Sequence, residues 1–448
     1  MPAERIVTNL VEPVPMSEEV PFTAERENGN NRWTDVASVS IGCAVPMVVF
    51  GRASIVPFVA LPVIIGLCRS DTGFFRMIQE AIRRHRFLMM AVAATILFWL
   101  TSSVASIDPV KSLSTWARTA AILALGVMLT AFLSQSKRRV DLALKSLTIS
   151  SFGLLLFYAV FSLYIHPAPF EIFRLIKGPN AIALQTLKPY FSVSACILPI
   201  VVWAGFRLGS FHKWIALFSI PLTFLLIYGK GVQPGLSAAF GVVAGFLLVV
   251  FFLGLKFLPT YLARTLVLLI FCAAAAGGIY LIDGLPTPPA AAIPSSELSF
   301  PDWHRQVIWG FTVEVIKTAP VLGVGPNAIN LLPGANELIP GMNQEYIPSH
   351  PHNWLLEIGA ETGLVGLVLF VTSLLTALKT LGALAIRQSS AAWAATALFG
   401  AFWGSSLANF SIWSAWWLVV FAALLSLPLA TMVRVNKKIG ASEMRPSY

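Results

Sequence analysis

Long apolar segments alternate with short polar ones along most of the chain. A helix needs about 18 or more consecutive apolar residues to cross the hydrocarbon core of a bilayer. The pattern predicts about twelve such helices, of which the first two are short and can form one hairpin. They cover residues 36–51, 54–69, 88–105, 115–133, 144–165, 181–206, 212–229, 235–254, 264–282, 353–378, 391–408 and 412–433. We therefore predict an all-α, polytopic integral membrane protein.

One polar connection, residues 283–352 between the ninth and tenth predicted spans, is much longer than the others. Its start is too rich in proline for a helix. Residues 302–318 repeat apolar positions at helical spacing, so we predict a short amphipathic helix lying on the membrane surface. The apolar face of this helix carries Ile308, Phe311 and Val315. A glycine-rich turn at 323–327 follows, and the rest of the connection is predicted to be irregular.

The composition supports a membrane protein with polar tails. The 448 residues are 56% hydrophobic and 12% charged, whereas soluble domains carry about 25% charged residues. Residues 1–35 are polar and contain prolines, which predicts a disordered cytoplasmic tail. The membrane domain then covers residues 36–433, and residues 434–448 form a cytoplasmic C-terminal tail.

The positive charge follows the predicted spans. The formal net charge is +10, with 31 basic residues. If the N-terminus lies in the cytoplasm, most basic residues fall on the cytoplasmic side, as the positive-inside rule requires. Both termini are then cytoplasmic, and the charge is explained without nucleic acid. Nine basic residues run against the rule and are candidates for binding an anion: Arg52, Lys111, Arg118, Arg174, Lys177, Lys188, Lys230, Arg305 and Lys317.

Two of the six histidines, His350 and His352, lie two residues apart where the long connection meets the tenth predicted span. Ionisable side chains at such a boundary are costly unless they have a function. No third ligand accompanies the pair, so no metal site is predicted. The four cysteines all lie in apolar runs and predict no disulfide. The sequence contains no phosphate loop, dinucleotide fingerprint or hydrolase serine elbow.

Several short motifs between about residues 175 and 430 together resemble the core of the O-antigen ligase and polymerase superfamily. They are Gly178-Pro179-Asn180-Ala181-Ile-Ala183, Arg305-x-x-Ile308-Trp309, Pro320-Val-Leu-Gly323-Val-Gly325, His350-Pro-His352-Asn353, Leu356-Glu357, Glu361-Thr-Gly363-Leu-Val-Gly366 and Asn409-Phe-Ser411. One motif departs from the family, because Tyr228-Gly229-Lys230-Gly231 stands where a Ser-Arg-Gly turn is common. Lysine supplies the charge but not the two-pronged grip of arginine on a phosphate.

The resemblance implies a membrane glycosyltransferase in the bacterial inner membrane, with its active site facing the periplasm. Such an enzyme moves a glycan from undecaprenyl diphosphate to a sugar hydroxyl without a metal or another cofactor. The acceptor is lipid A-core in a ligase, which we favour, or another glycan in an O-antigen or exopolysaccharide polymerase. A third relative glycosylates protein. The alternative of another class is a lipid-linked glycan flippase or transporter, because twelve spans with both ends inside are a common transporter layout.

The resemblance also implies roles for the polar residues. His352 is the candidate general base, since neutral histidine accepts protons near neutral pH, and His350 supports it. His352 can instead serve only at the helix start. Arg305, Lys230 and Lys188 are candidates for stabilising the departing diphosphate. Their alternatives are a side chain reaching to lipid headgroups for Arg305 and a solvated turn for Lys230.

Two residues of the tenth predicted span complete the candidate site. Asn353 can bind substrate or cap the helix. Glu357 can orient a histidine, bind a cation or simply favour the helix start. The tryptophan group Trp413, Trp416 and Trp417 is predicted to be an interfacial belt rather than a platform for sugars.

Overall fold

The computed structural model describes residues 32–68, 85–178, 180–287, 303–387 and 389–443, together with positions 79 and 83. The predicted N-terminal tail up to residue 31 and the last five residues lie outside this part. The main helices are α1 (Arg32–Ala44), α2 (Ile55–Cys68), α4 (Arg86–Val104), α5 (Pro109–Ser134), α6 (Lys137–Leu154), α7 (Ala168–Lys177), α8 (Ala183–Leu208), α9 (Ser210–Tyr228), α10 (Val232–Phe257), α11 (Thr260–Asp283), α12 (Trp303–Thr318), α13 (Trp354–Ile386), α14 (Ser390–Ser406) and α15 (Ala415–Glu443).

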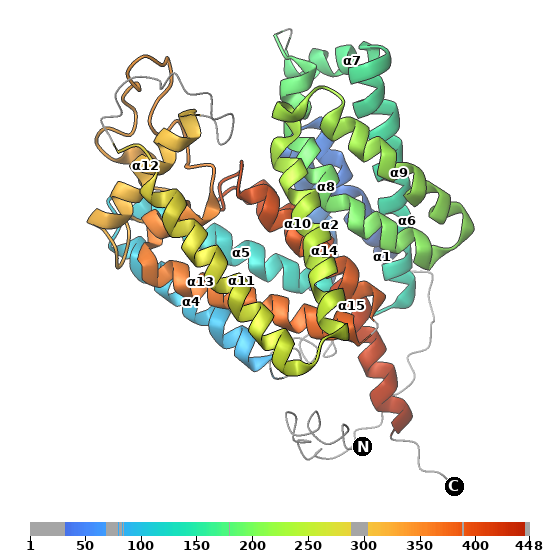
Figure 1. The fold of residues 1–448 in the computed structure, drawn as a ribbon. Helices are drawn as coiled ribbons and strands as arrows, with labels where there is room; N and C mark the ends of the chain where they lie inside the picture. Colours follow the sequence, from blue (N-terminus) through green and yellow to red (C-terminus); the bar gives the residue numbers. More distant parts are fainter. Residues whose placement is uncertain are drawn as a thin grey trace. The chain divides into compact units, whose positions relative to one another are not determined.

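Short helical segments complete the fold. The 3-10 helices η2 (Pro46–Phe50) and η3 (Arg52–Ser54) join α1 to α2, and the π-helical segment η4 (Leu155–Ile165) continues α6. No strand occurs among the described residues, so the all-α class is confirmed. From α4 to α11 the helices follow one another with short connections, whereas a long connection that contains α12 lies between α11 and α13 (Figure 1).

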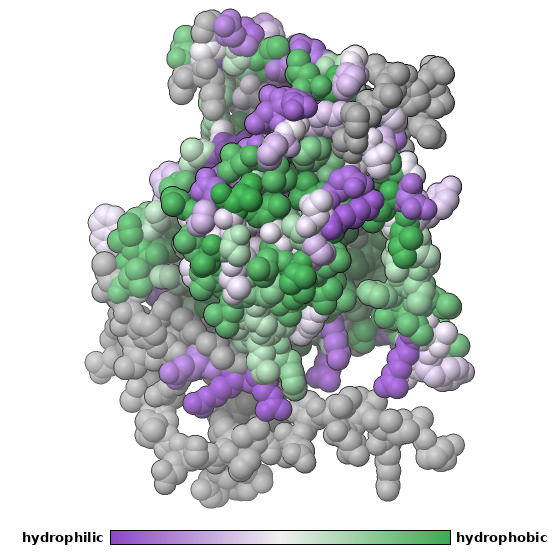
Figure 2. Space-filling view, turned by 90° about the vertical axis from the view of Figure 1, so that its left-hand side faces the viewer, coloured by the Kyte–Doolittle hydropathy of each residue, from purple (hydrophilic) through white to green (hydrophobic). Residues whose placement is uncertain are grey.

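Nine described helices are long and apolar enough to cross a membrane. The polytopic membrane architecture is therefore confirmed, but the count of about twelve is not. The three other predicted spans correspond to α1, α2 and α14, with 13, 14 and 17 residues. Fourteen helical residues span about 21 Å, which is less than the roughly 30 Å hydrocarbon core. On the face seen in Figure 2, hydrophobic residues cover the middle and hydrophilic ones gather towards both ends.

Helices α10 and α14 pack closely because both present glycines four residues apart (Figure 1). A Cβ atom on Gly400 would lie 2.7 Å from the carbonyl oxygen of Ala244 and from the Cα of Gly245. A Cβ on Gly404 would lie 2.9 Å from the carbonyl of Phe240. Small residues permit this close approach, which is the main source of helix association in a membrane. The sequence patterns 241–245 and 400–404 thus set the spacing of two central helices.

The long connection binds to a kink in α13. Gly363 has φ of 69°, and this non-helical residue opens the helix backbone. Val324 donates its backbone N–H to the carbonyl of Ala360 at 3.0 Å, and Gly325 donates to that of Glu361 at 2.8 Å. Leu364 donates to the carbonyl of Pro320 at 2.7 Å. The glycine-rich turn predicted at 323–327 is therefore an anchor of the long connection.

The amphipathic helix predicted within residues 302–318 is present as α12, and its apolar face packs against protein. Its position on the membrane surface stays a prediction. Ile308 and Val315 are 0% and 6% exposed. They pack into a small hydrophobic cluster formed mainly by the long connection itself and by the first turns of α13. Helical periodicity reveals an apolar face, but it does not reveal whether lipid or protein covers that face.

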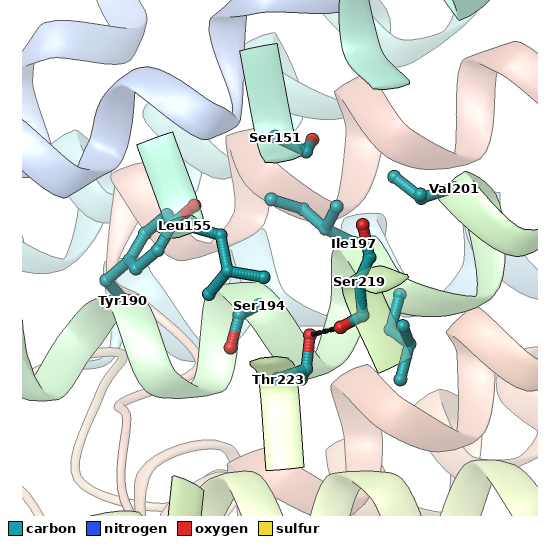
Figure 3. Close-up of a pocket in the computed structure, with 9 residues that line it drawn as sticks. Ser151, Leu155, Tyr190, Ser194, Ile197, Val201, Ser219 and Thr223 are labelled. Atoms are coloured by element: carbon teal, nitrogen blue, oxygen red, sulfur yellow. Dashed lines mark hydrogen bonds between the residues drawn. The ribbon is translucent and has the colours of Figure 1, made fainter. Parts of the chain in front are cut away.

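A small cavity lies between the α6–η4 segment, α8 and α9 (Figure 3). Ser151, Tyr190, Ser194 and Thr223 line it, and its volume is about 10 Å³. The hydroxyl of Ser151 has no hydrogen-bond partner among the described residues. A cavity of this size accommodates about one water molecule, so it is excluded as a site for a sugar or a diphosphate.

Candidate functional site

The two histidines converge on one carbonyl oxygen from a distant part of the chain. Nε2 of His350 lies 2.6 Å from the backbone oxygen of Asn409, and Nδ1 of His352 lies 2.8 Å from it. Asn409 belongs to the turn between α14 and α15. The two imidazole rings meet edge to face with centroids 4.2 Å apart. The structure thus brings the predicted pair together as a unit.

These contacts define which ring nitrogens carry protons. A carbonyl oxygen only accepts hydrogen bonds, so Nε2 of His350 and Nδ1 of His352 both donate to Asn409. Nδ1 of His350 then carries a lone pair and accepts from the hydroxyl of Ser349, 2.8 Å away. Nε2 of His352 also carries a lone pair, and no hydrogen bond to it occurs within the described residues. Of the two rings, His352 therefore keeps a basic nitrogen that no described residue engages.

The backbone around His352 is held from several sides. Trp309 on α12 donates from its indole N–H to the carbonyl of Pro351 at 3.0 Å. The side-chain oxygen of Asn353 caps α13 by accepting from Leu355 N at 3.0 Å. His352 itself has φ of 58°, a conformation that non-glycine residues rarely adopt. Such strain persists where the surroundings enforce it, often at functional sites.

Glu357 and Glu361 lie one turn apart on α13, and each is 1% exposed. Glu357 accepts from the hydroxyl of Ser411 at 2.5 Å and from the backbone N–H of Ile412 at 2.9 Å. Both carboxylate oxygens of Glu357 thus contact the turn that presents the carbonyl of Asn409. This geometry fits a residue that orients the histidines through this turn.

Glu361 holds the long connection in the same way, by accepting hydrogen bonds from its backbone. Its carboxylate accepts backbone N–H groups from Asn327 at 2.6 Å and from Ile329 at 3.1 Å. It also accepts the indole N–H of Trp413. The two buried glutamates therefore tie both polar connections to α13.

The environment keeps both histidines neutral. Burial lowers the pKa of His352 to about 3, and the charge of His350 adds to this effect. The hydrogen bond to Asn409 opposes the shift, whereas Arg305 and His304 reinforce it. Burial also lowers the pKa of His350, and Arg52 contributes. At neutral pH the lone pair on His352 is therefore not blocked by a proton.

One arginine acts on each histidine. Arg305 on α12 lowers the pKa of His352, and its role in the site stays a prediction. Arg52 on η3 influences His350, and its guanidinium lies 5.2 Å from the ring centroid of Trp416. Arg52 was not among the predicted site residues. In the sequence, Arg52 stood out only because its charge falls on the predicted outer side, whereas most basic residues fall on the cytoplasmic side.

The two predicted lysines lie on other elements. Lys230 is exposed in the turn between α9 and α10, with Nζ 4.9 Å from the ring centroid of Tyr164 on η4. Lys188 is exposed near the start of α8. No contact or charge interaction described for Lys230 reaches the histidines. Its role in the site stays a prediction, as does that of Lys188.

The interfacial position predicted for the tryptophan group is wrong for two of its members. Trp413 and Trp417 are 2% and 0% exposed. Trp413 packs edge to face on Trp99, and the indole of Trp417 donates to the hydroxyl of Ser406 at 2.8 Å. The buried carboxylate of Glu361 draws the indole of Trp413 inward, a partner that local sequence does not show.

Sequence similarity covers the same region. A family described as O-antigen ligase matches residues 200–371, which include Lys230, Arg305 and both histidines. A proposed polysaccharide ligase of Rickettsia bellii is 25% identical over 359 residues, which cover 74% of this chain and 78% of that protein. Both matches support assignment of this chain to the O-antigen ligase superfamily.

Other similar proteins match a shorter segment of this chain. Proposed polysaccharide ligases of Rickettsia felis and Rickettsia conorii are each 30% identical over 137 residues. These matches span 30% of the length of each relative. Within the described residues, no group of three His, Cys, Asp or Glu side chains is arranged to hold a metal ion. Among the charged groups described around the histidine pair, Arg305 acts on His352 and Arg52 acts on His350.

Proposed function

We propose that this protein is a membrane glycosyltransferase that moves a glycan from undecaprenyl diphosphate to a sugar hydroxyl. The acceptor that we favour is lipid A-core, which makes the protein an O-antigen ligase. One observation carries the proposal: His352 is fixed through Nδ1 by the carbonyl of Asn409, with the lone pair left on Nε2. Similarity to the O-antigen ligase family over residues 200–371 supports the substrate class.

In the proposed step, one bond forms at the anomeric carbon of the glycan and one bond from that carbon breaks. The acceptor oxygen attacks the anomeric carbon of the donor glycan, and the bond from that carbon to the diphosphate oxygen breaks. Nε2 of His352 accepts the hydroxyl proton, while the diphosphate leaves with the bonding electrons. Arg305 and Arg52 stabilise its developing negative charge. Lys230 and Lys188 remain candidates for binding the diphosphate or the glycan further along its path, and Asn353 stays a candidate ligand.

The low pKa of His352 in the free protein suggests how donor binding could strengthen this base. In the free protein, the positive charge of Arg305 disfavours protonation of His352. A bound diphosphate neutralises this charge and raises the affinity of Nε2 for a proton. His352 therefore becomes a stronger base when the donor is in place. The charged imidazole that forms is stabilised by its hydrogen bond to Asn409.

We propose that the active site faces the periplasm of the bacterial inner membrane and that both termini are cytoplasmic. The charge bias of the connections supports this orientation. The reaction as written needs no metal and no nucleotide, because the diphosphate of the lipid is the leaving group.

A clean deletion in the native bacterium, complemented with the wild type or His352→Ala, tests the function. A ligase predicts loss of polymer on lipid A-core and accumulation of lipid-linked polymer. Caps of a single repeat unit would indicate a polymerase instead, and absence of lipid-linked glycan in the periplasm would indicate a flippase. Normal surface glycan from a normally expressed His352→Ala protein would contradict the role of His352.

A further inference from the structure

A second cavity, much larger than the one in Figure 3, lies between α8, α9, α10 and α14. Its volume is about 700 Å³, within the range of sites that hold small organic ligands. Apolar side chains form most of its lining, among them Trp203, Phe206 and Phe246. Phe246 is 66% exposed, so the cavity is a groove that opens on the outer surface of the helices.

This groove lies away from the histidines. The histidine pair directly precedes α13, a helix of 33 residues, and Ser390 at the start of α14 lines the groove. α13 ends at Ile386, only a few residues before Ser390. The part of α13 that follows the kink at Gly363, residues 364–386, alone spans about 35 Å. The mouth of the groove therefore lies near the opposite end of the helices from the candidate active site.

Two basic side chains lie at this mouth, each against an aromatic ring of the lining. The guanidinium of Arg207 lies 5.8 Å from the ring centroid of Trp203, and Nζ of Lys213 lies 5.3 Å from that of Phe206. Asp141 contacts Arg207 at 3.5 Å and offsets one of the two charges. The feature is therefore an apolar groove in the membrane region with net positive charge at one end.

We propose that this groove binds one anionic phospholipid from the leaflet opposite to the candidate active site. The acyl chains lie along the apolar wall, and the headgroup phosphate contacts Arg207 and Lys213. The exposed Phe246 places the opening where bilayer lipid has access. The glycan donor is a poorer fit, because its diphosphate has to reach His352 at the other end. The inference does not depend on the proposed transferase activity.

The test uses the full-length protein purified in mild detergent and titrated with phosphatidylglycerol or phosphatidylcholine, with bound lipid counted by native mass spectrometry. We expect one retained phosphatidylglycerol. Each neutralised basic residue near a membrane surface weakens binding of anionic lipid roughly fivefold. The double variant Arg207→Gln/Lys213→Gln should therefore lose roughly 25-fold in affinity. Arg264→Gln, on exposed α11 near the same end, is the matched control and should bind like the wild type.

A second variant tests the apolar wall. Ala397 lines the groove, so Ala397→Phe should displace the acyl chains and lower phosphatidylglycerol occupancy at least fivefold. If Ala397→Phe does not fold, the double variant Arg207→Gln/Lys213→Gln still tests whether the groove binds anionic lipid. Equal retention of phosphatidylcholine, or unchanged binding in the double variant, would overturn the proposal. Displacement of phosphatidylglycerol by equimolar undecaprenyl phosphate would also overturn it, because the groove would then hold a polyprenyl chain.

Discussion

His352 donates its Nδ1 proton to the backbone carbonyl of Asn409, 57 residues later in the chain and 2.8 Å away. This single contact selects the tautomer of His352 and leaves Nε2 as its basic nitrogen. The same carbonyl accepts from His350, so one turn orients both rings. The catalytic hypothesis therefore depends on the α14–α15 turn as much as on the histidines.

Replacing His352 by Ala should abolish most glycan transfer. Loss of a positioned general base typically lowers the rate by about 10²–10⁴-fold. His350→Ala should have a smaller effect, because Nδ1 of His350, which carries the lone pair, already accepts a hydrogen bond from Ser349. His166→Ala is the matched control, since His166 is exposed before α7. Transfer is measured from purified lipid-linked glycan to acceptor, and equal losses in His352→Ala and His166→Ala would contradict the assignment.

The pH profile of transfer should be unusual for a histidine base. His352 is active when neutral, and its pKa of about 3 keeps it neutral well below pH 6.5. The value of kcat/KM, which reports the free enzyme, should therefore stay nearly constant from pH 8 to pH 5. Arg305→Gln removes one of the charges that lower this pKa and should move any acid limb to higher pH. An acid limb near pH 6.5 in the wild type would argue against His352 as a buried neutral base.

Stability should decrease in acid for the same reason. The pKa of His352 is lower in the folded than in the unfolded protein, so the unfolded chain binds more protons below pH 6.5. The contribution of neutral His352 is complete above pH 6.5 and is lost as the pH falls towards 3. At pH 5 the loss is at most about 2 kcal/mol, from 1.36 kcal/mol per pKa unit. Thermal unfolding in detergent at pH 7 and 5 measures it, and His352→Gln should reduce the difference between these two pH values.

Arg305 should act on the leaving group. Removal of one group that stabilises developing negative charge typically lowers kcat by about 10²–10³-fold. We expect a loss of this order for Arg305→Ala, and only partial recovery for Arg305→Lys, because lysine lacks the planar fork. Lys317→Ala, in a surface ion pair with Glu314 at the other end of α12, is the control. Full activity of Arg305→Ala with normal expression would remove Arg305 from the site.

Glu357 should act through the α14–α15 turn rather than on the substrate. In Glu357→Gln, one oxygen is replaced by an NH₂ group that faces a donor, either the hydroxyl of Ser411 or the N–H of Ile412. An unsatisfied buried donor costs about 1–3 kcal/mol. We expect that loss of stability, together with lower kcat at temperatures where the fold is intact. The donor KM should change little, because both carboxylate oxygens of Glu357 are engaged by Ser411 and Ile412 in the turn.

The control for this variant is Glu314→Gln, which alters a carboxylate in the surface ion pair with Lys317. Its stability and activity should match those of the wild type. A Glu357→Gln protein with a greatly raised donor KM and unchanged kcat would instead indicate direct contact with substrate.

The helices of this protein were largely predictable because the signal is local. A run of apolar residues favours the bilayer wherever the rest of the chain lies, and α8 to α11 follow the predicted spans closely. The three short helices α1, α2 and α14 show the limit of this argument. Their sequences are apolar, but each is shorter than an ordinary span.

The candidate site was predictable only in part. The histidine pair, Arg305 and Glu357 stand out by residue type and position, since charged groups at a membrane boundary are rare. Arg52 does not, because its proximity to His350 depends on how the α1–α2 hairpin packs. The turn at Asn409 matched a family motif, yet nothing in that motif indicated that its backbone oxygen, rather than a side chain, contacts the histidines.

By itself, the sequence determined the membrane class, the long connection, the histidine pair and the likeness to the superfamily. All of these follow from local composition or from contiguous motifs. The tertiary structure alone decided which nitrogen of His352 is basic, that Trp413 is buried and that Arg52 joins the site. These facts depend on contacts between residues that lie from about fifty to about three hundred positions apart. Such contacts arise from the packing of whole helices, whereas hydrophobicity acts on each segment separately.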